Sequence, residues 1–176
     1  MARDFSLMVQ SIGMTSASIY ILSHRANRLQ TYRPLLLFIP VALVGFVLGM
    51  QLLQQIPVYI IQALFLSLIT SFALIYSLGT HRGDRAQLKV VTLGDQVWLL
   101  LMLLAGGMCA SLFGTGADII LYTLLVTRFR LQEKIATHFS IILMASISVL
   151  GFAYRYFYDQ TVTTYQIQTW LCAFPV

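Results

Sequence analysis

The chain has 176 residues, of which 59% are hydrophobic and 10% are charged, whereas roughly 25% of residues are charged in an ordinary soluble domain. This composition excludes a soluble globular fold and indicates a protein whose solvent is the lipid bilayer. The net charge of +5 does not indicate a nucleic-acid partner, because nearly every basic residue lies in a short loop between apolar runs, where it sets membrane orientation.

Long apolar runs follow one another along the chain, separated by short polar gaps. A helix needs roughly 20 apolar residues to cross the hydrocarbon of a bilayer, and the full-length runs are of that order. They are residues 5–22, 34–53, 56–78, 97–126 and 135–156, followed by a shorter run over residues 167–176. The sequence therefore predicts an all-α, polytopic, multi-pass membrane protein.

The second and third runs are separated by very little chain. Only Gln54 and Gln55 stand between the end of the second run and Ile56-Pro57, and proline is tolerated in the first turn of a helix. We therefore expect these two runs to form a tight antiparallel helical hairpin.

The fourth run is too long for one membrane crossing and too short for two. One helix over residues 97–126 would be about 45 Å long, and two crossings would need about 40 residues. Its centre reads Gly114-Thr115-Gly116, and glycine adopts backbone conformations that end a helix. We therefore expect a re-entrant pair of half-helices around these glycines.

The positive charges give an orientation, because Lys and Arg mark the cytoplasmic side of a membrane protein. Three loops hold nine of the eleven: Arg25, Arg28, Arg33, Arg82, Arg85, Lys89, Arg128, Arg130 and Lys134. With all three loops cytoplasmic, Arg3 and Arg155 remain on the other side. The fourth run must then enter and leave on one side, as a re-entrant pair does.

The order of features repeats weakly along the chain. Residues 14–19 (Met-Thr-Ser-Ala-Ser-Ile) and residues 136–141 (Ala-Thr-His-Phe-Ser-Ile) are both hydroxyl-rich helix starts, and Pro40 in the second run has a counterpart in Pro175. By the charge count the first run goes inward and the fifth outward. The two halves would then be inverted repeats, an architecture that many secondary transporters use.

The alignment of the two repeats divides the chain into three parts. They are a repeat-one part (residues 1–78), a cytoplasmic linker (79–96) and a repeat-two part (97–176). No counterpart of the glycine break precedes the first run, and the last run covers only the first third of the second. The chain is therefore expected to be a fragment that lacks both ends of the repeat pair.

The residues around the glycine break resemble a known family. The stretch Ala105-Gly-Gly-Met-Cys-Ala-Ser-Leu-Phe-Gly-Thr-Gly-Ala-Asp118 and the charged connector and helix start at residues 129–140 are similar to the second signature of the TauE/SafE sulfite-exporter family. Residues 11–18 resemble the first-repeat counterpart. The resemblance implies a secondary membrane transporter of small sulfur-containing anions, such as sulfite or sulfonates. Because the first-repeat glycine segment and the last helices of the second repeat are missing, transport is expected of the parent protein and not of the fragment itself.

The glycine break has two interpretations. A half-helix that begins after Gly116 presents backbone N–H groups and a positive dipole end to an anion, and Thr115 adds a hydroxyl donor. Alternatively, Gly114 and Gly116 only permit close helix packing, as small residues do in membranes. Asp118 also has two interpretations. It stabilises the N-terminal end of the helix as a cap, or it is a carboxylate whose burial in the membrane is costly and which serves proton coupling or lines the site.

Other polar residues are weaker candidates. His138 suits proton coupling or anion pairing and equally a hydrogen bond to a neighbouring helix, and helix hydroxyls often bond only to the preceding turn. Gly45 and Gly49 have the spacing of packing residues. The predicted substrate-binding residues are Gly114, Thr115, Gly116, Asp118, Thr137, His138, Ser140, Thr15 and Ser16, with Ser18 as a further pathway hydroxyl.

Catalysis is not expected. His138 and Asp118 alone make neither a nucleophile with its base nor a metal site, and Cys109 and Cys172 lie far apart inside apolar runs. The sequence therefore predicts no enzyme, no cofactor and no metal. The rival to transport is a non-transporting assembly or scaffold subunit whose polar residues serve helix packing, and homo-oligomerisation is left open.

Overall fold

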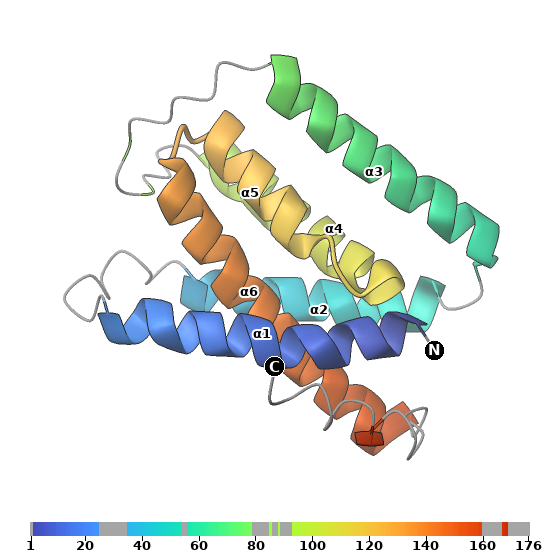
Figure 1. Ribbon diagram of the computed structural model, residues 1–176. Helices are drawn as coiled ribbons and strands as arrows, with labels where there is room; N and C mark the ends of the chain where they lie inside the picture. Colours follow the sequence, from blue (N-terminus) through green and yellow to red (C-terminus); the bar gives the residue numbers. More distant parts are fainter. Residues whose placement is uncertain are drawn as a thin grey trace.

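The described part of the chain is almost entirely helical. The computed structural model describes residues 2–24, 35–53, 56–78, 85, 88, 93–159 and 167–168. Its elements, labelled in Figure 1, are α1 (Ala2–His24), α2 (Leu35–Leu53), α3 (Val58–Leu78), α4 (Leu93–Phe113), α5 (Ala117–Thr127), α6 (Glu133–Tyr154) and a π-helical turn, η2 (Arg155–Asp159). The predicted all-α class is confirmed.

Three of the described helices are long and apolar enough to cross a membrane. They are Tyr59–Ser77, Leu93–Phe113 and Glu133–Phe157, whereas Leu37–Leu53 and Ala117–Thr127 are apolar but shorter. α1, expected to cross, is not among the three, because polar side chains interrupt its apolar sequence. The last predicted run, residues 167–176, lies outside the described residues except for 167–168.

α2 and α4 pack closely through glycines. A Cβ on Gly107 would lie 2.8 Å from the backbone nitrogen of Phe46, and one on Gly45 would lie 3.0 Å from the Cα of Leu104. A Cβ on Gly49 would also meet α4 atoms. The prediction that Gly45 and Gly49 are packing residues is therefore confirmed, and α4 is their partner.

α3 does not form the expected hairpin with α2. Figure 1 shows the two helices diverging from their connector, with α3 beside α4 and α5. The rings of Phe65 and Phe113 lie 5.1 Å apart, and those of Phe72 and Tyr122 lie 6.2 Å apart. The tight antiparallel packing is absent because the glycine face of α2 is already filled by α4, and most α3 side chains stay exposed.

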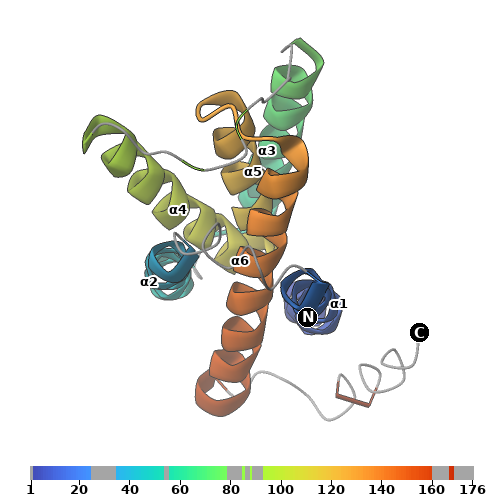
Figure 2. The ribbon, with the colours of Figure 1, turned by 90° about the vertical axis from the view of Figure 1, so that its left-hand side faces the viewer.

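The core of the protein is built around α6. Figure 2 shows α6 running between α2 on one side and α1 on the other. The Phe38 and Phe139 rings lie 6.3 Å apart, and a Cβ on Gly151 would lie 2.6 Å from Cζ of the Phe46 ring. The inverted-repeat relation and the domain boundaries stay predictions, because the counterpart of α2 falls almost entirely outside the described residues.

Candidate functional site

α4 and α5 form a helical hairpin that turns at the predicted glycine break. Gly114 has φ 77° and Gly116 has φ 115°, and both values lie in the left-handed region that favours glycine. The Gly114 N–H donates to the Ala110 carbonyl at 2.8 Å, which ends α4. The predicted helix break is confirmed at these residues.

The open ends of this hairpin lie together. Arg128 Nη2 lies 3.1 Å from Asp95 Oδ1. Nearby, the Arg85 N–H donates to the Arg130 carbonyl at 3.2 Å, and the Gln132 N–H donates to the Arg85 carbonyl at 3.0 Å. The basic connectors before α4 and after α5 therefore meet at one end of the hairpin, in agreement with the charge count.

The two arms of the hairpin are unequal. α5 has 11 residues and α4 has 21, which correspond to about 16 and 31 Å. The return arm has the expected half-length. The outgoing arm is longer than expected because the helix begins at Leu93, with Asp95 in its first turn.

Asp118 accepts hydrogen bonds at the start of α5. The Gly116 N–H donates to Asp118 Oδ1 at 3.0 Å, and the Thr115 hydroxyl donates to the same oxygen at 3.4 Å. The hydrogen bonds of α5 begin with the Ile120 N–H donating to the Gly116 carbonyl at 3.1 Å, so the N–H groups of residues 117–119 have no acceptor within the helix. The carboxylate thus takes the Gly116 N–H and the Thr115 hydroxyl, two donors that an anion would use.

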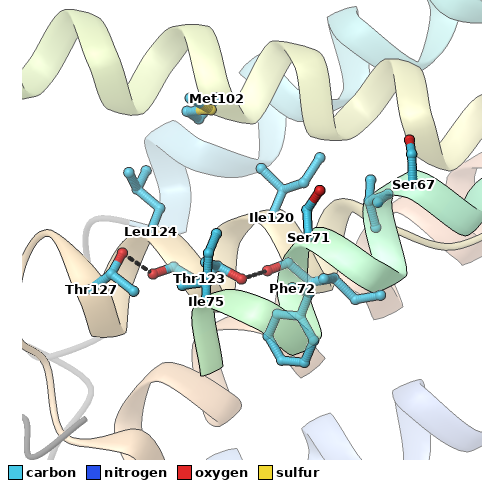
Figure 3. Close-up of a pocket in the computed structure, with 11 residues that line it drawn as sticks. Ser67, Ser71, Phe72, Ile75, Met102, Ile120, Thr123, Leu124 and Thr127 are labelled. Carbon is cyan, nitrogen blue, oxygen red and sulfur yellow. Dashed lines mark hydrogen bonds between the residues drawn. The ribbon is translucent and has the colours of Figure 1, made fainter. Parts of the chain in front are cut away.

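An open cleft reaches the first turn of α5. It has a volume of about 370 Å³ and lies between α3, α4 and α5 (Figure 3). The hydroxyls of Ser67, Thr123 and Thr127 line it, but each donates to a carbonyl of its own helix, at 2.6 to 2.8 Å. The cleft is therefore largely apolar and offers few protons to an anion. Its lining includes Ile119 and Ile120 of the first turn of α5 but not Asp118.

The predicted residues of α6 lie away from the break. Thr137 is exposed and donates to the Glu133 carbonyl at 2.8 Å, and buried Ser140 donates to the Ala136 carbonyl at 2.9 Å. His138 is half-buried. These residues lie in the first two turns of α6, which begins beside the end of α5 opposite to the glycine break (Figure 1). The hydrogen bonds of Thr137 and Ser140 stay within α6.

The predicted residues of α1 divide between two environments. Ser16 is exposed, whereas Thr15 is half-buried with its hydroxyl oxygen fully covered. Sequence reasoning missed two buried polar residues of α6 and its end, Ser148 and Arg155. The charge count put Arg155 on the non-cytoplasmic side and made no prediction about its burial. It lies near the end of the apolar stretch Glu133–Phe157, and an arginine within such a stretch is the signal that would have marked it.

Comparison with known proteins gives a family and no nearer relative. No curated protein sequence and no solved structure matches the chain. The sequence model of the family described as Sulfite exporter TauE/SafE matches residues 5–174, nearly the whole chain. With its all-α fold and its apolar helices long enough to cross a bilayer, this chain is a membrane protein that belongs to the sulfite exporter TauE/SafE family of transporters.

Proposed function

We propose that this protein is a secondary transporter of small sulfur-containing anions, such as sulfite, sulfonates or related organic anions, and that it binds them at the N-terminal end of α5. The observation that supports this site is the group of backbone hydrogen-bond donors at the glycine break. They are the Gly116 N–H and the first-turn N–H groups of α5. Such groups, with the positive end of the helix dipole, stabilise an anion. Membership of a sulfite-exporter family supports the substrate class.

Asp118 couples anion binding at this site to the uptake of a proton. Its carboxylate accepts the Gly116 N–H and the Thr115 hydroxyl, so an ionised Asp118 competes with an anion for both donors and repels its charge. When the carboxyl group takes up a proton, the repulsion ends and both donors can turn to an oxygen of the substrate. Anion binding at this site is therefore coupled to protonation of Asp118.

The proposed topology is multi-pass. α1, α2, α3 and α6 cross the bilayer, and the α4–α5 hairpin enters and leaves on the cytoplasmic side. The pairing of Asp95 with Arg128 and the backbone bonds of Arg85 support this arrangement, because they hold the two basic connectors at one end of the hairpin. Basic loops favour the cytoplasm.

The test is anion flux in proteoliposomes that contain the purified full chain. We expect saturable uptake of sulfite or of a sulfonate, with sulfate as the comparison anion. Thr115→Val, which removes one hydroxyl donor and keeps the shape, should raise KM about tenfold, since a hydrogen bond to a charged group contributes roughly 1.5–3 kcal/mol.

The matched control is Thr70→Val on the exposed side of α3, where the hydroxyl donates to its own helix, and it should transport like the unmodified chain. Flux that is absent from this chain but present in the parent protein would match the expectation that the chain alone does not transport. Flux that is absent from both would refute transport and favour the scaffold interpretation.

A further inference from the structure

The cleft between α3, α4 and α5 is elongated. On α5 its lining begins at Ile119 and ends at Thr127. On α3 the lining begins at Ser67 and ends at Ile75. Each stretch covers eight helical steps, or about 12 Å, and Figure 1 shows the two helices side by side. The space of about 370 Å³ is therefore a groove along two helices.

The lining of this groove suits a hydrocarbon chain. None of the described residues that line it carries a charge, and most of them are aliphatic or aromatic. Figure 3 shows Met102 of α4 facing Ile120 and Ser71 across the groove. The hydroxyl protons of Thr123 and Thr127 already go to carbonyls of α5. A ligand here would gain from the burial of apolar surface and not from hydrogen bonds.

The groove has hydrocarbon on its outer side. Its outer wall is α3, whose stretch Tyr59–Ser77 is apolar and long enough to cross a membrane, and no residue of that stretch is buried. Leu66 and Leu74 are 65% and 60% exposed. In a bilayer these side chains face lipid, so lipid acyl chains are the molecules that surround the groove.

Positive charge begins where the groove ends. Thr127 is the last lining residue of α5, and Arg128 follows it with a side chain that is 63% exposed. Arg128 donates to Asp95 through Nε and Nη2, which uses two of the five N–H donors of a guanidinium. This ion pair at the surface leaves the arginine accessible from outside.

The same end of the hairpin holds further positive charge. Its exposed basic residues are Arg85, Arg128, Arg130 and Lys134. The backbone bonds of Arg85 to residues 130 and 132 hold the connectors together. With Asp95 and Glu133, the described residues of this end carry a net charge of +2. An apolar groove that ends at a basic surface matches a molecule with an apolar chain and an anionic head.

We propose that the groove between α3 and the α4–α5 hairpin binds an acyl chain of an anionic phospholipid, whose head group lies on the basic connectors beyond Thr127. Basic pockets between transmembrane helices on the cytoplasmic side bind anionic head groups, and the cytoplasmic leaflet carries the anionic lipids. In the proposed topology this end of the hairpin faces the cytoplasm. The bound chain would complete the packing between α3 and the hairpin.

Trp98 is an intrinsic probe of this site. It lies four residues before Met102, which lines the groove, and therefore on the same face of α4. Its side chain is 53% exposed. Trp98 and Trp170 are the two tryptophans of the chain, so Trp170→Phe leaves one fluorophore, which brominated lipids quench when they lie beside it.

The test uses the full chain with Trp170→Phe in phosphatidylcholine vesicles that contain increasing fractions of a brominated lipid. Brominated phosphatidylglycerol should reach half-maximal quenching of Trp98 at a mole fraction about threefold lower than brominated phosphatidylcholine does. Ser71→Phe, which fills the groove, should abolish this preference. The matched control is Thr70→Phe, since Thr70 is the exposed neighbour of Ser71 and does not line the groove. This control should keep the preference.

The head group is tested by charge. Arg128→Gln and Arg130→Gln should each reduce the preference for phosphatidylglycerol by about half, whereas Arg128→Lys, which keeps the charge, should retain it. The control is Arg3→Gln, which removes a positive charge near the start of α1 and should have no effect.

Three results would overturn the proposal. Equal quenching by the two brominated lipids would show that the site does not select an anionic head group. A preference that Ser71→Phe and Thr70→Phe leave equally intact would place the lipid outside the groove. Absence of quenching by both lipids would show that protein, such as a second copy of this chain, covers this face. None of these results depends on anion flux, so lipid binding and transport succeed or fail separately.

Discussion

Asp118 is the residue on which the proposed proton coupling depends. An amide at this position keeps the oxygen that accepts the Gly116 N–H but cannot change its charge. We therefore expect Asp118→Asn to fold and to transport with a pH dependence that differs from that of the unmodified chain. Flux in proteoliposomes measured across a series of pH values checks this expectation.

The control for this experiment is Asp95→Asn. Asp95 pairs with exposed Arg128 at the open end of the hairpin, far from the break, so its removal should leave the shape of the pH profile unchanged. An unaltered profile in Asp118→Asn would reduce Asp118 to a helix cap.

Sequence reasoning could find Thr115 and Asp118 because they adjoin two glycines in a run of anomalous length. It could not find Ser148, because the burial of a hydroxyl on a helix depends on which other helix packs against it. The hydropathy of a sequence does not show which helices pack together. The charge count placed Arg155 on the non-cytoplasmic side of the membrane, which does not predict whether its side chain is buried. The structure shows it 2% exposed, because protein surrounds it there.

At the scale of elements, the α2–α4 contact leaves no room for a side chain at Gly107. A Cβ there would lie 2.8 Å from the Phe46 nitrogen and would also meet the Ala42 carbonyl. These are backbone atoms, which cannot move away by a change of side-chain rotamer. Overpacking of this kind costs about 1–3 kcal/mol. We expect Gly107→Ala to lower the apparent Tm in detergent by several degrees, measured by circular dichroism.

Gly13→Ala is the matched control for this substitution. Gly13 lies within α1, and nothing lies within 4 Å of a Cβ built there. Alanine is favoured over glycine in a helix by about 0.8–1 kcal/mol, so this variant should keep or raise the Tm. If both variants unfold at the same temperature, α2 and α4 are not packed as described.

The sequence predicted most helix limits to within a few residues, because apolar runs and polar gaps alternate clearly. It placed the start of the fourth run at residue 97, whereas α4 begins at Leu93. The first turn of α4 is polar, so a search for apolar runs does not include it. The α2–α3 hairpin was wrong for another reason. A short connector keeps two helix ends close, but side-chain packing decides whether the helices then run together.

For the whole molecule, the backbone bonds between Arg85 and residues 130 and 132 require both basic connectors to lie on one side of the membrane. In a chain with Cys109 and Cys172 replaced, Arg85→Cys and Arg130→Cys should therefore react with a membrane-impermeant maleimide from the same side of oriented vesicles. Gln54→Cys, in the connector between α2 and α3, should react from the opposite side. Opposite accessibility at positions 85 and 130 would overturn the re-entrant arrangement.

The unequal arms of the α4–α5 hairpin have an electrical consequence. In the proposed topology α5 enters from the cytoplasmic side, and its 11 residues rise about 16 Å, half of a hydrocarbon core of about 30 Å. An anion at the proposed site would therefore have crossed about half of the transmembrane voltage. A full crossing changes the energy of a unit charge by about 2.3 kcal/mol per 100 mV. Occupancy of the site would then shift by about 1.1 kcal/mol per 100 mV, which makes the affinity for substrate a function of the membrane potential.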